Sequence, residues 1–450
     1  MTPVLMSVYL LASAFGAEEG FVPLFNGRDL SGWVNVDVAP ETFTVRDGLI
    51  VSTGVPTGTM RTERMYENFI LELEWRHMKP QGNAGVFIWG DPLSAVGTPF
   101  SRGIEVQVLD GRNSETYTSH GDVFSIWSAR MKPDRPHPTG AERCLPSEWR
   151  CKPSPEWNHY RITCNDGVIK LAVNGKEVSG GSECRPRKGY ICLESEGSEC
   201  HFRNLRIKEL PSTNASPEET AHADRGFRTI YTGLDLRNWK VTDKHREHWQ
   251  SKDWRLVYDG NCDADDPHLW TEREYGDFEF ICDWRFTAKP TKKLRPVLRP
   301  DGSEAKSADG TAEMIEVDDA GDSGIQLRGS KKNEVNIWCW PCGSGELWGY
   351  RTDTSLSADL RAAATPKIKA DRPAGQWNRF FIRMKGDRVT VILNGELVID
   401  RAQLPGIAAT GPIGLQHHGD PLEFANIYIR ELKGDESDAL PGPLAPLPRR

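Results

Sequence analysis

The chain has 450 residues, of which 38% are hydrophobic and 27% charged, with a formal net charge of −8. This composition argues against a disordered chain or a membrane bundle and fits a globular protein of two or three domains. The acidic balance argues against a nucleic-acid partner, which would favour a basic patch. Fifteen Trp supply flat surfaces suited to cores and to sugar rings.

The N-terminus has the pattern of a secretory signal peptide. An apolar run from Val4 to Phe15 ends in small residues and is followed by Glu18 and Glu19. We therefore expect residues 1–17 to be a signal peptide and the protein to be exported, to the bacterial periplasm or the extracellular space. No later run approaches the roughly 20 apolar residues of a membrane-spanning helix.

Ten cysteines, six in the first half of the chain and four in the second, fit an oxidised, exported protein. Both numbers are even, so each half could form disulfides of its own. The sequence leaves the connectivity open.

The chain repeats itself, because six blocks recur in the same order in both halves. The blocks, each first-half block followed by its second-half partner, are FVPLFNGRDLSGW (21–33) and FRTIYTGLDLRNW (227–239), NFILELEWR (68–76) and DFEFICDWR (277–285), NAGVFIWG (83–90) and DSGIQLRG (322–329), EVQV (105–108) and EVNI (334–337), EWNHYRITCNDGVIKLAVNGKEV (156–178) and QWNRFFIRMKGDRVTVILNGELV (376–398), and ICLESEGSECHFRNLRIKEL (191–210) and IGLQHHGDPLEFANIYIREL (413–432). We predict two copies of one domain, at 22–210 and 227–432, a polar linker at 211–226 and a disordered Pro-rich tail at 433–450.

The repeated blocks have the pattern of β-strands. LELEWR alternates apolar and charged residues with a period of two. Asn165-Asp166-Gly167 separates two β-rich runs and predicts a hairpin, and Asn174-Gly175 marks the next turn. No segment predicts an amphipathic helix longer than two turns. The fold class is therefore all-β, with two tandem β-sandwiches of the jelly-roll type.

Strand alternation places a polar set of side chains on one open face of each copy. In the first copy the set is Phe87, Trp89, Glu105, Gln107, Glu194 and Glu196, and in the second it is Gln326, Arg328, Glu334, Asn336, Gln416 and His418. A solvated sheet face would also be polar without any function. The same residue types on several central strands nevertheless favour a concave binding site for a polyhydroxylated ligand.

The blocks LFNGRDLSGW, FILELEWR, EVQVLDG, SGIQLRG, LNGELV and GPIGLQHHGDPLEFANIYIREL resemble the 3-keto-disaccharide hydrolase domain family. The resemblance implies a fold like the concanavalin-like lectin/glucanase jelly roll, in both copies. It also implies a sugar substrate already oxidised to a ketone at C3. Such a ketone acidifies the C2 hydrogen, so elimination followed by hydration is one mechanism, and direct hydrolysis by two carboxylates is the other.

The resemblance also implies site residues. In the second copy, Glu334 and His418 are the expected acid and base, in an order that stays open, and the residues expected to hold the ketone and hydroxyls are Arg328, Asn336 and Gln416. In the first copy, the expected binding residues are Trp89, Glu105, Gln107, Glu194 and Glu196, with Trp89 and Phe87 available to stack on a ring. Three clustered carboxylates carry a cost unless they share a proton or a cation, so Ca²⁺ is the one cofactor considered.

Two other functions fit the same pattern. The chain would then be a non-catalytic, lectin-like carbohydrate-binding protein of two sandwiches, or a surface interaction protein built on a durable fold. A single pocket that collects Glu334, Arg328 and His418 would favour the enzyme. For both the enzyme and the lectin-like protein, the expected partner is a sugar. We expect no nucleic-acid partner and no membrane-spanning segment.

Overall fold

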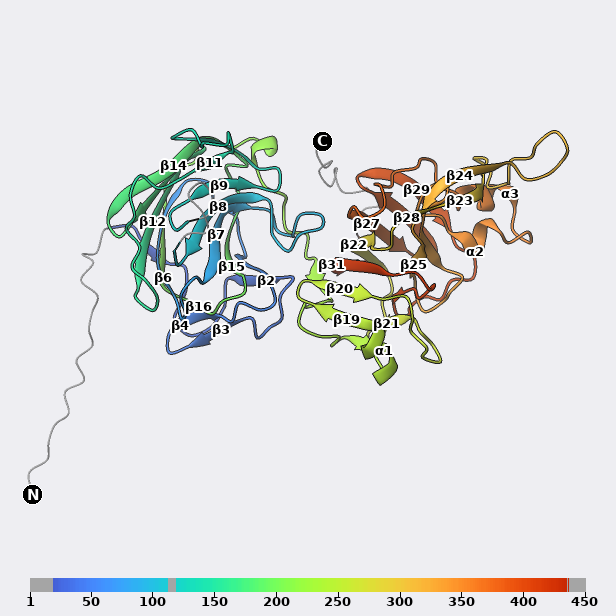
Figure 1. Ribbon diagram of the computed structural model, residues 1–450, viewed down its shortest axis with the longest axis horizontal. Helices are drawn as coiled ribbons and strands as arrows, with labels where there is room; N and C mark the ends of the chain where they lie inside the picture. Colours follow the sequence, from blue (N-terminus) through green and yellow to red (C-terminus); the bar gives the residue numbers. More distant parts are fainter. Residues whose placement is uncertain (1–18, 112–118, 435, 437–450) are drawn as a thin grey trace, which may run out of the picture.

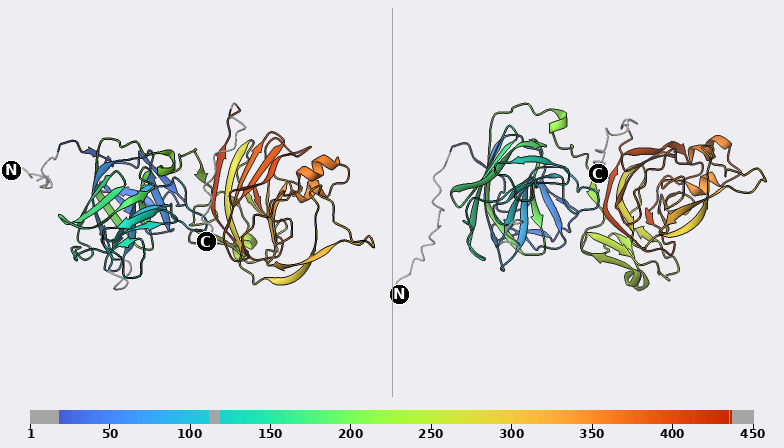
Figure 2. Two further views of the ribbon diagram at one scale, coloured as in Figure 1. Left: turned by 90° about the horizontal axis from the view of Figure 1, so that it is seen from above. Right: turned by 45° about the horizontal axis from the view of Figure 1, so that its top comes forward.

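The computed structural model describes residues 19–111, 119–434 and 436. The predicted signal peptide and most of the predicted tail lie outside these residues. Figure 1 shows two β-sandwiches side by side, and both views in Figure 2 keep them so. The prediction of an all-β chain with two tandem lectin-like sandwiches is confirmed.

The N-terminal domain packs a back sheet against a front sheet. The back sheet contains β1 (Val22–Pro23), β3 (Phe43–Arg46), β4 (Leu49–Ser52), β6 (Phe69–His77), β10 (Arg130–Pro133), β12 (Asn158–Asn165), β13 (Val168–Val173), β14 (Lys176–Arg185) and β16 (Cys200–Glu209). The front sheet contains β2 (Trp33–Val36), β5 (Gly58–Thr62), β7 (Asn83–Gly90), β8 (Gly103–Leu109), β9 (Val123–Ile126), β11 (Arg143–Cys144) and β15 (Tyr190–Ser195). The 3₁₀ turn η1 (Pro217–Glu219) lies in the linker.

The C-terminal domain repeats this plan. Its back sheet contains β17 (Arg228–Thr229), β19 (Trp249–Lys252), β20 (Arg255–Tyr258), β22 (Phe278–Phe286), β27 (Asn378–Lys385), β28 (Arg388–Leu393), β29 (Glu396–Gln403) and β31 (Leu422–Glu431). Its front sheet contains β18 (Trp239–Lys240), β21 (Leu269–Thr271), β25 (Asp322–Gln326), β26 (Glu334–Trp338) and β30 (Gly414–Leu415). The remaining elements are the hairpin β23 (Thr291–Pro296) with β24 (Met314–Asp319), and the helices α1 (Asp243–His248), α2 (Trp348–Arg351) and α3 (Ala358–Ala363).

Alternation along the strands divides each sheet into a core face and an outward face. In β6, Leu71, Leu73 and Trp75 enter the core of the N-terminal domain, while Glu72 and Glu74 point outward into ion pairs. The two cores consist of apolar and aromatic side chains from both sheets of each domain. Burial of this apolar face holds the register, because a slip by one residue would turn the whole face to water.

The predicted hairpin turns are present. Asp166 has φ 48° and Gly167 has φ 72°, and Asn174 with Gly175 repeats the pattern at φ 47° and 88°. Two successive left-handed residues give the turn whose twist matches antiparallel strands, and only Gly, Asn and Asp adopt it at low cost. These turns connect β12 to β13 and β13 to β14.

The two domains meet through the outward face of the C-terminal back sheet. Ile281, Phe381 and Tyr428 on this face form an apolar cluster with Val36 of the N-terminal domain and Phe227, the first residue of the second copy. The loop between β7 and β8 crosses the same face, in the gap between the sandwiches in Figure 1. The contact is therefore a packed interface rather than a flexible tether.

A buried polar network completes this interface. Asp283 receives hydrogen bonds from Arg379 (Nε to Oδ1, 2.5 Å), from the backbone of Gly97 (2.8 Å) and from Asn426 (2.7 Å). Asp37 receives hydrogen bonds from Tyr428 and from Ser94. Partners from both domains therefore satisfy both buried carboxylates, which fixes how the domains dock.

The expectation of disulfides is wrong, because all ten cysteines are free thiols in the described part of the chain. Cys164, Cys184 and Cys200 lie in the N-terminal core, and Cys262 and Cys282 lie in the C-terminal core. They pack there as small apolar side chains, which is a common role of free cysteine. Among residues 19–111, 119–434 and 436, no helix is long and apolar enough to cross a membrane.

Candidate active site

Polar side chains gather on the outward face of the C-terminal front sheet. Glu334 lies directly across from Gln326, and Asn336 lies across from Gly324. Gln416 follows β30, and its backbone N–H donates to the carbonyl of Gly324 (2.9 Å). Adjacent strands of one sheet thus bring together the three predicted residues Glu334, Asn336 and Gln416.

Glu334 rests on a glycine. A Cβ atom at Gly324 would lie 2.6 Å from Cγ and from Oε1 of Glu334, so only glycine leaves room for this carboxyl. The amide of Gln416 donates a hydrogen bond to Oε2 of Glu334 (2.5 Å). Burial raises the pKa of Glu334 to about 8, with a further contribution from the charge of Asp322 and an opposing one from the Gln416 hydrogen bond. At neutral pH the group is therefore mainly a carboxylic acid.

Asp322 and His418 lie at the more open end of this face. His418 is exposed and Asp322 is half-buried. Burial raises the pKa of Asp322 to about 6, while the nearby charge of His418 lowers it. The side chain of Asp420 accepts a hydrogen bond from the backbone of Asp322 (2.9 Å), which ties the segment that carries His418 to the start of β25.

A buried ion pair closes the other side. The backbone of Asn336 pairs with that of Glu346, and the carboxylate of Glu346 binds Arg351. Burial raises the pKa of Glu346 to about 7 in spite of Arg351. The charge of Glu346 in turn raises the pKa of Glu334. Glu346, Arg351 and Asp322 were not among the predicted site residues.

The N-terminal domain builds the same arrangement from different side chains. A Cβ atom at Gly85 would lie 2.8 Å from Oε2 of Glu194 and 2.9 Å from Oε1 of Glu105, so both carboxyls lie over one glycine. Burial, and then their mutual charge, raises the pKa of Glu194 well above its ordinary value, and burial raises that of Glu105 to about 8. Glu196 accepts a hydrogen bond from Asn83.

Gln107, Asp122 and Arg143 extend the N-terminal site. Gln107 donates to Asn83 Oδ1 (2.7 Å) and to a backbone carbonyl (2.9 Å). Asp122 pairs with Arg143 (2.6 Å), and both side chains are buried. This pair holds the place of Glu346 and Arg351, because the backbone of Gln107 donates to Asp122 as that of Asn336 donates to Glu346.

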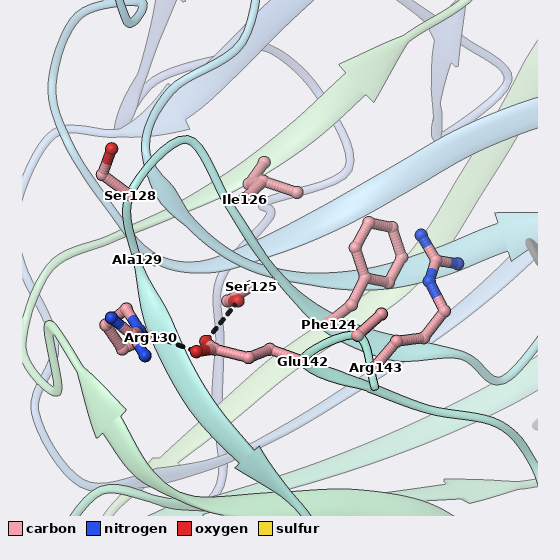
Figure 3. A pocket seen from close by; sticks show the side chains of 9 residues that line it. Phe124, Ser125, Ile126, Ser128, Ala129, Arg130, Glu142 and Arg143 are labelled. Atoms are coloured by element: carbon pink, nitrogen blue, oxygen red, sulfur yellow. Dashed lines mark hydrogen bonds and ion pairs between the residues drawn. The ribbon is translucent and has the colours of Figure 1, made fainter. Parts of the chain in front are cut away.

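A cavity of about 370 Å³ opens at the edge of the N-terminal front sheet. Figure 3 shows Phe124 and Arg143 together at one side of it, with Arg143 Cζ 3.5 Å from the centre of the Phe124 ring. Glu142 binds Ser125 and Arg130 on the opposite side. Because Phe124 lies directly across from Glu105, the cavity adjoins the carboxyl cluster.

Two predicted site residues lie elsewhere. Trp89 is fully buried in the N-terminal core and donates from Nε1 to the carbonyl of Glu67 (2.8 Å). Arg328 donates to the carbonyls of Gly276, Gly386 and Ala408 and binds Asp277. Trp89 has φ 56° and Arg328 has φ 49°. This left-handed residue breaks the alternation on which the prediction rested, so both side chains turn away from the open face. The expected grouping of Arg328 with Glu334 and His418 is therefore absent.

Phe87 keeps the predicted side of the sheet but is not available for stacking. It is fully buried in a cluster with Tyr190 and Cys192, against which Phe100 and Ile126 pack. Loop residues therefore cover this part of the N-terminal front sheet. The other predicted residues remain predictions as to role, although the structure places them on the two front faces.

The missed residues differ in how visible they are in the sequence. Asp322 occupies the first position of the repeated block, where the first copy has Asn83, so comparison of the blocks would have found it. Glu346 and Arg351 lie in no repeated block. Within the described ranges, no three His, Cys, Asp or Glu side chains are arranged as ligands of a metal ion.

The family model described as the 3-keto-alpha-glucoside-1,2-lyase-like domain matches residues 20–208 and again residues 226–430. The chain belongs to this family. The two matches cover most of the chain, one in each sandwich, so the internal repeat is a repeat of the family's domain. Membership in this family, together with a relative that is named a hydrolase, supports at a coarse level that the protein is a carbohydrate-active hydrolase.

Relatives of the family's domain match about one copy each. A Bacteroides thetaiotaomicron protein named 3-keto-disaccharide hydrolase is 23% identical over 245 residues, covering 43% of this chain and 79% of its own length. A solved Parabacteroides distasonis structure with the provisional name glycosyl hydrolase is 25% identical, with 43% of this chain and 95% of that chain covered and a TM-score of 0.32. The carbohydrate-binding module CBM66 from Bacillus subtilis is 9% identical, with coverages of 40% and 97% and a TM-score of 0.29.

Proposed function

We propose that the C-terminal domain cleaves glycosides whose sugar carries a ketone at C3, with Glu334 as the proton donor and His418 as the base. The observation that supports this most is the carboxyl of Glu334, which burial keeps protonated near neutral pH on an otherwise polar face. A general acid must hold its proton at the working pH, and few carboxyls do. Family membership supplies the substrate class.

The reaction balances with these two groups. Neutral His418 removes the C2 proton, the electron pair forms the C1–C2 double bond, and the C1–O bond breaks as Glu334 protonates the leaving oxygen. The product is an enone and a free alcohol. Water then adds to C1 with the Glu334 carboxylate as the base, and His418 returns its proton to C2. Both groups regain their starting protonation states.

The remaining residues fit supporting roles. The amide of Gln416 holds the Glu334 carboxyl in one orientation. Asn336 lies next to Glu334 on the same outward face and offers an amide to the ketone oxygen or to a hydroxyl. Glu346, held by Arg351, adds negative charge that helps to keep the proton on Glu334. We further propose that the apolar N-terminal segment directs export, which N-terminal sequencing of the mature protein would test.

The experiment is turnover of a 3-keto-glucoside with a chromogenic aglycone by the full-length protein. Glu334→Gln and His418→Ala should each lower kcat/KM on the order of 10²- to 10⁴-fold. Glu63→Gln is the matched control, because Glu63 is exposed and lies beyond the end of β5 rather than within a strand. The wild-type rate should fall above pH about 8, since the loss of the Glu334 proton removes the acid.

Product analysis separates the mechanisms. Incorporation of deuterium at C2 in D₂O supports elimination followed by hydration, whereas retention of the C2 hydrogen would favour direct hydrolysis. Loss of turnover with Glu105→Gln but not with Glu334→Gln would contradict the assignment to the C-terminal domain. Sugar binding by a wild type that turns nothing over would leave a lectin-like protein instead.

A further inference from the structure

The N-terminal front face carries more acid than its counterpart. At corresponding positions the C-terminal domain has Glu334, Gln416 and His418, and the N-terminal domain has Glu105, Glu194 and Glu196. The N-terminal side chains are not solvent-exposed surface groups, because Glu105 is 7% exposed and Glu194 is 1% exposed. A buried carboxyl of this kind is costly unless a proton or a partner compensates for it.

One carboxyl oxygen of this cluster and one neighbouring hydroxyl lack a hydrogen-bond partner. Within the described residues, neither Oε2 of Glu194 nor Oγ1 of Thr59 forms a hydrogen bond, and both atoms are buried. Thr59 lies directly across from Glu194 on the neighbouring strand, so its hydroxyl points to the same face. Thr59 is itself fully buried. The two unpartnered atoms thus belong to directly opposed residues of the neighbouring strands β15 and β5.

The nearby cation does not compensate for this acid. Arg143 is held by Asp122 at 2.6 Å, so its charge is already matched. The other charged groups that act on the cluster are Asp122 on Glu105, Asp253 of the C-terminal domain on Glu196, and the three glutamates on one another. Among the described residues, Arg143 is therefore the cation that acts on Glu105, and Asp122 shares its charge.

We propose that the N-terminal front face is a second carbohydrate site, selective for a sugar that carries a protonated primary amine. The ammonium group would lie over Gly85, where it donates to Glu105, Glu194 and the Thr59 hydroxyl. An ammonium group suits carboxylate oxygens better than a sugar hydroxyl does. All of its N–H groups can donate, and each hydrogen bond to a carboxylate is charge-assisted. The carboxyls do not converge as ligands of one metal ion among the described residues.

The adjoining cavity gives the rest of such a sugar a place to lie. Phe124, one ring face of which is covered by Arg143, lies next to Glu105, and Arg143 and Arg130 line the space of about 370 Å³ beyond it. An apolar ring face with polar groups around it suits a pyranose. The proposal goes beyond the cleavage reaction of the C-terminal domain and does not depend on it.

The test is calorimetric titration of the full-length protein at pH 7 with glucosamine, N-acetylglucosamine and glucose. Glucosamine should bind at least about tenfold more tightly than the other two, as expected for a hydrogen bond to a charged group. Burial raises the pKa of Glu105 to about 8 and that of Glu194 well above its ordinary value, so we expect an ammonium group to release protons from the cluster when it binds. Two buffers of different ionisation enthalpy measure this release.

Glu105→Gln and Glu194→Gln should each remove the preference for glucosamine and the proton release. The second change is compatible with the fold, since Gln416 occupies that position in the C-terminal domain. Glu63→Gln, which removes one exposed charge, should retain both. Equal binding of glucose, displacement of glucosamine by Ca²⁺ at stoichiometric concentration, or no binding heat would each overturn the proposal. None of these outcomes bears on turnover at Glu334, so the two proposals fail separately.

Discussion

The two front faces share a scaffold and differ in how they hold a proton. In both domains a glycine, Gly85 or Gly324, opens space for the carboxyl of a neighbouring strand. In the C-terminal domain the position opposite this glycine is occupied by Gln416, whose amide donates to the carboxyl without competing for the proton. In the N-terminal domain the neighbour is Glu194, so two acids share one place. The exchange of an amide for a carboxyl at this position therefore contributes to the coupled pair of the N-terminal domain.

The two back sheets differ in a second way. Glu74 on β6 and Asp283 on β22 occupy the same position of the repeated block. Glu74 binds Arg203, whose side chain is 37% exposed. Asp283 is fully buried beneath the loop from the N-terminal domain. The same strand position thus carries an ion pair with a partly exposed arginine in one copy and an interface anchor in the other.

The largest expected effect comes from Asp283→Asn, which breaks the interface anchor. The change leaves Arg379 close to neutral amides in a buried setting, so we expect a loss of about 3–5 kcal/mol in the free energy of unfolding. Denaturant titration with the tryptophans as reporters measures this loss. We also expect the single transition to divide as the domains uncouple. A loss below about 1 kcal/mol would show that the network does not hold the domains together.

Gly324→Ala should have the next largest effect, and we expect this effect on catalysis rather than on stability. The new methyl group would lie 2.6 Å from Glu334, so the carboxyl must move away from its place on the sheet. A displacement near 1 Å costs on the order of 100-fold in turnover, measured as kcat/KM on a 3-keto-glucoside. Gly276→Ala is the matched control, because its Cβ would meet nothing closer than 3.6 Å. Equal losses in both variants would contradict the role of Glu334.

Most of the fold could be predicted from the sequence, because the pattern of each repeated strand occurs in both copies. Alternation within the blocks places Glu105, Glu334 and Gln416 on the outward faces, where the structure has them. It fails at Trp89 and Arg328, because a left-handed residue ends the regular pleat and the composition of the strand gives no sign of it. Packing, not pattern, decides that position.

The rest of the site could not be read from one strand at a time. Glu346 joins the site only because its backbone pairs with Asn336 across a long connection. The expected disulfides failed for a related reason. Cysteine count indicates an oxidised protein, but the structure uses Cys164 and Cys282 as small core side chains. Neither outcome follows from local composition.

Gln416→Glu should give a smaller effect and sharpen the comparison of the front faces. The change removes the amide donor and adds a second acid, as in the N-terminal domain. Both effects disfavour the ionised form of Glu334, so its pKa rises from about 8 and the alkaline limb of the pH–rate profile moves upward. We expect a shift on the order of one pH unit and a change in kcat/KM at pH 7 below about tenfold. If the alkaline limb of the pH–rate profile did not move, a group other than Glu334 would determine its position.

Glu74→Gln should have the smallest effect, and it tests whether position or environment explains the largest one. Arg203 would lose its carboxylate partner but would keep its contact with Trp157, over whose ring its guanidinium carbon lies at 3.9 Å. Asn204 would still find an acceptor in the new amide. We therefore expect a loss below about 1 kcal/mol in the same denaturant titration. A loss as large as that of Asp283→Asn would mean that this strand position matters for the sandwich itself, and that domain docking is not what makes Asp283 costly to replace.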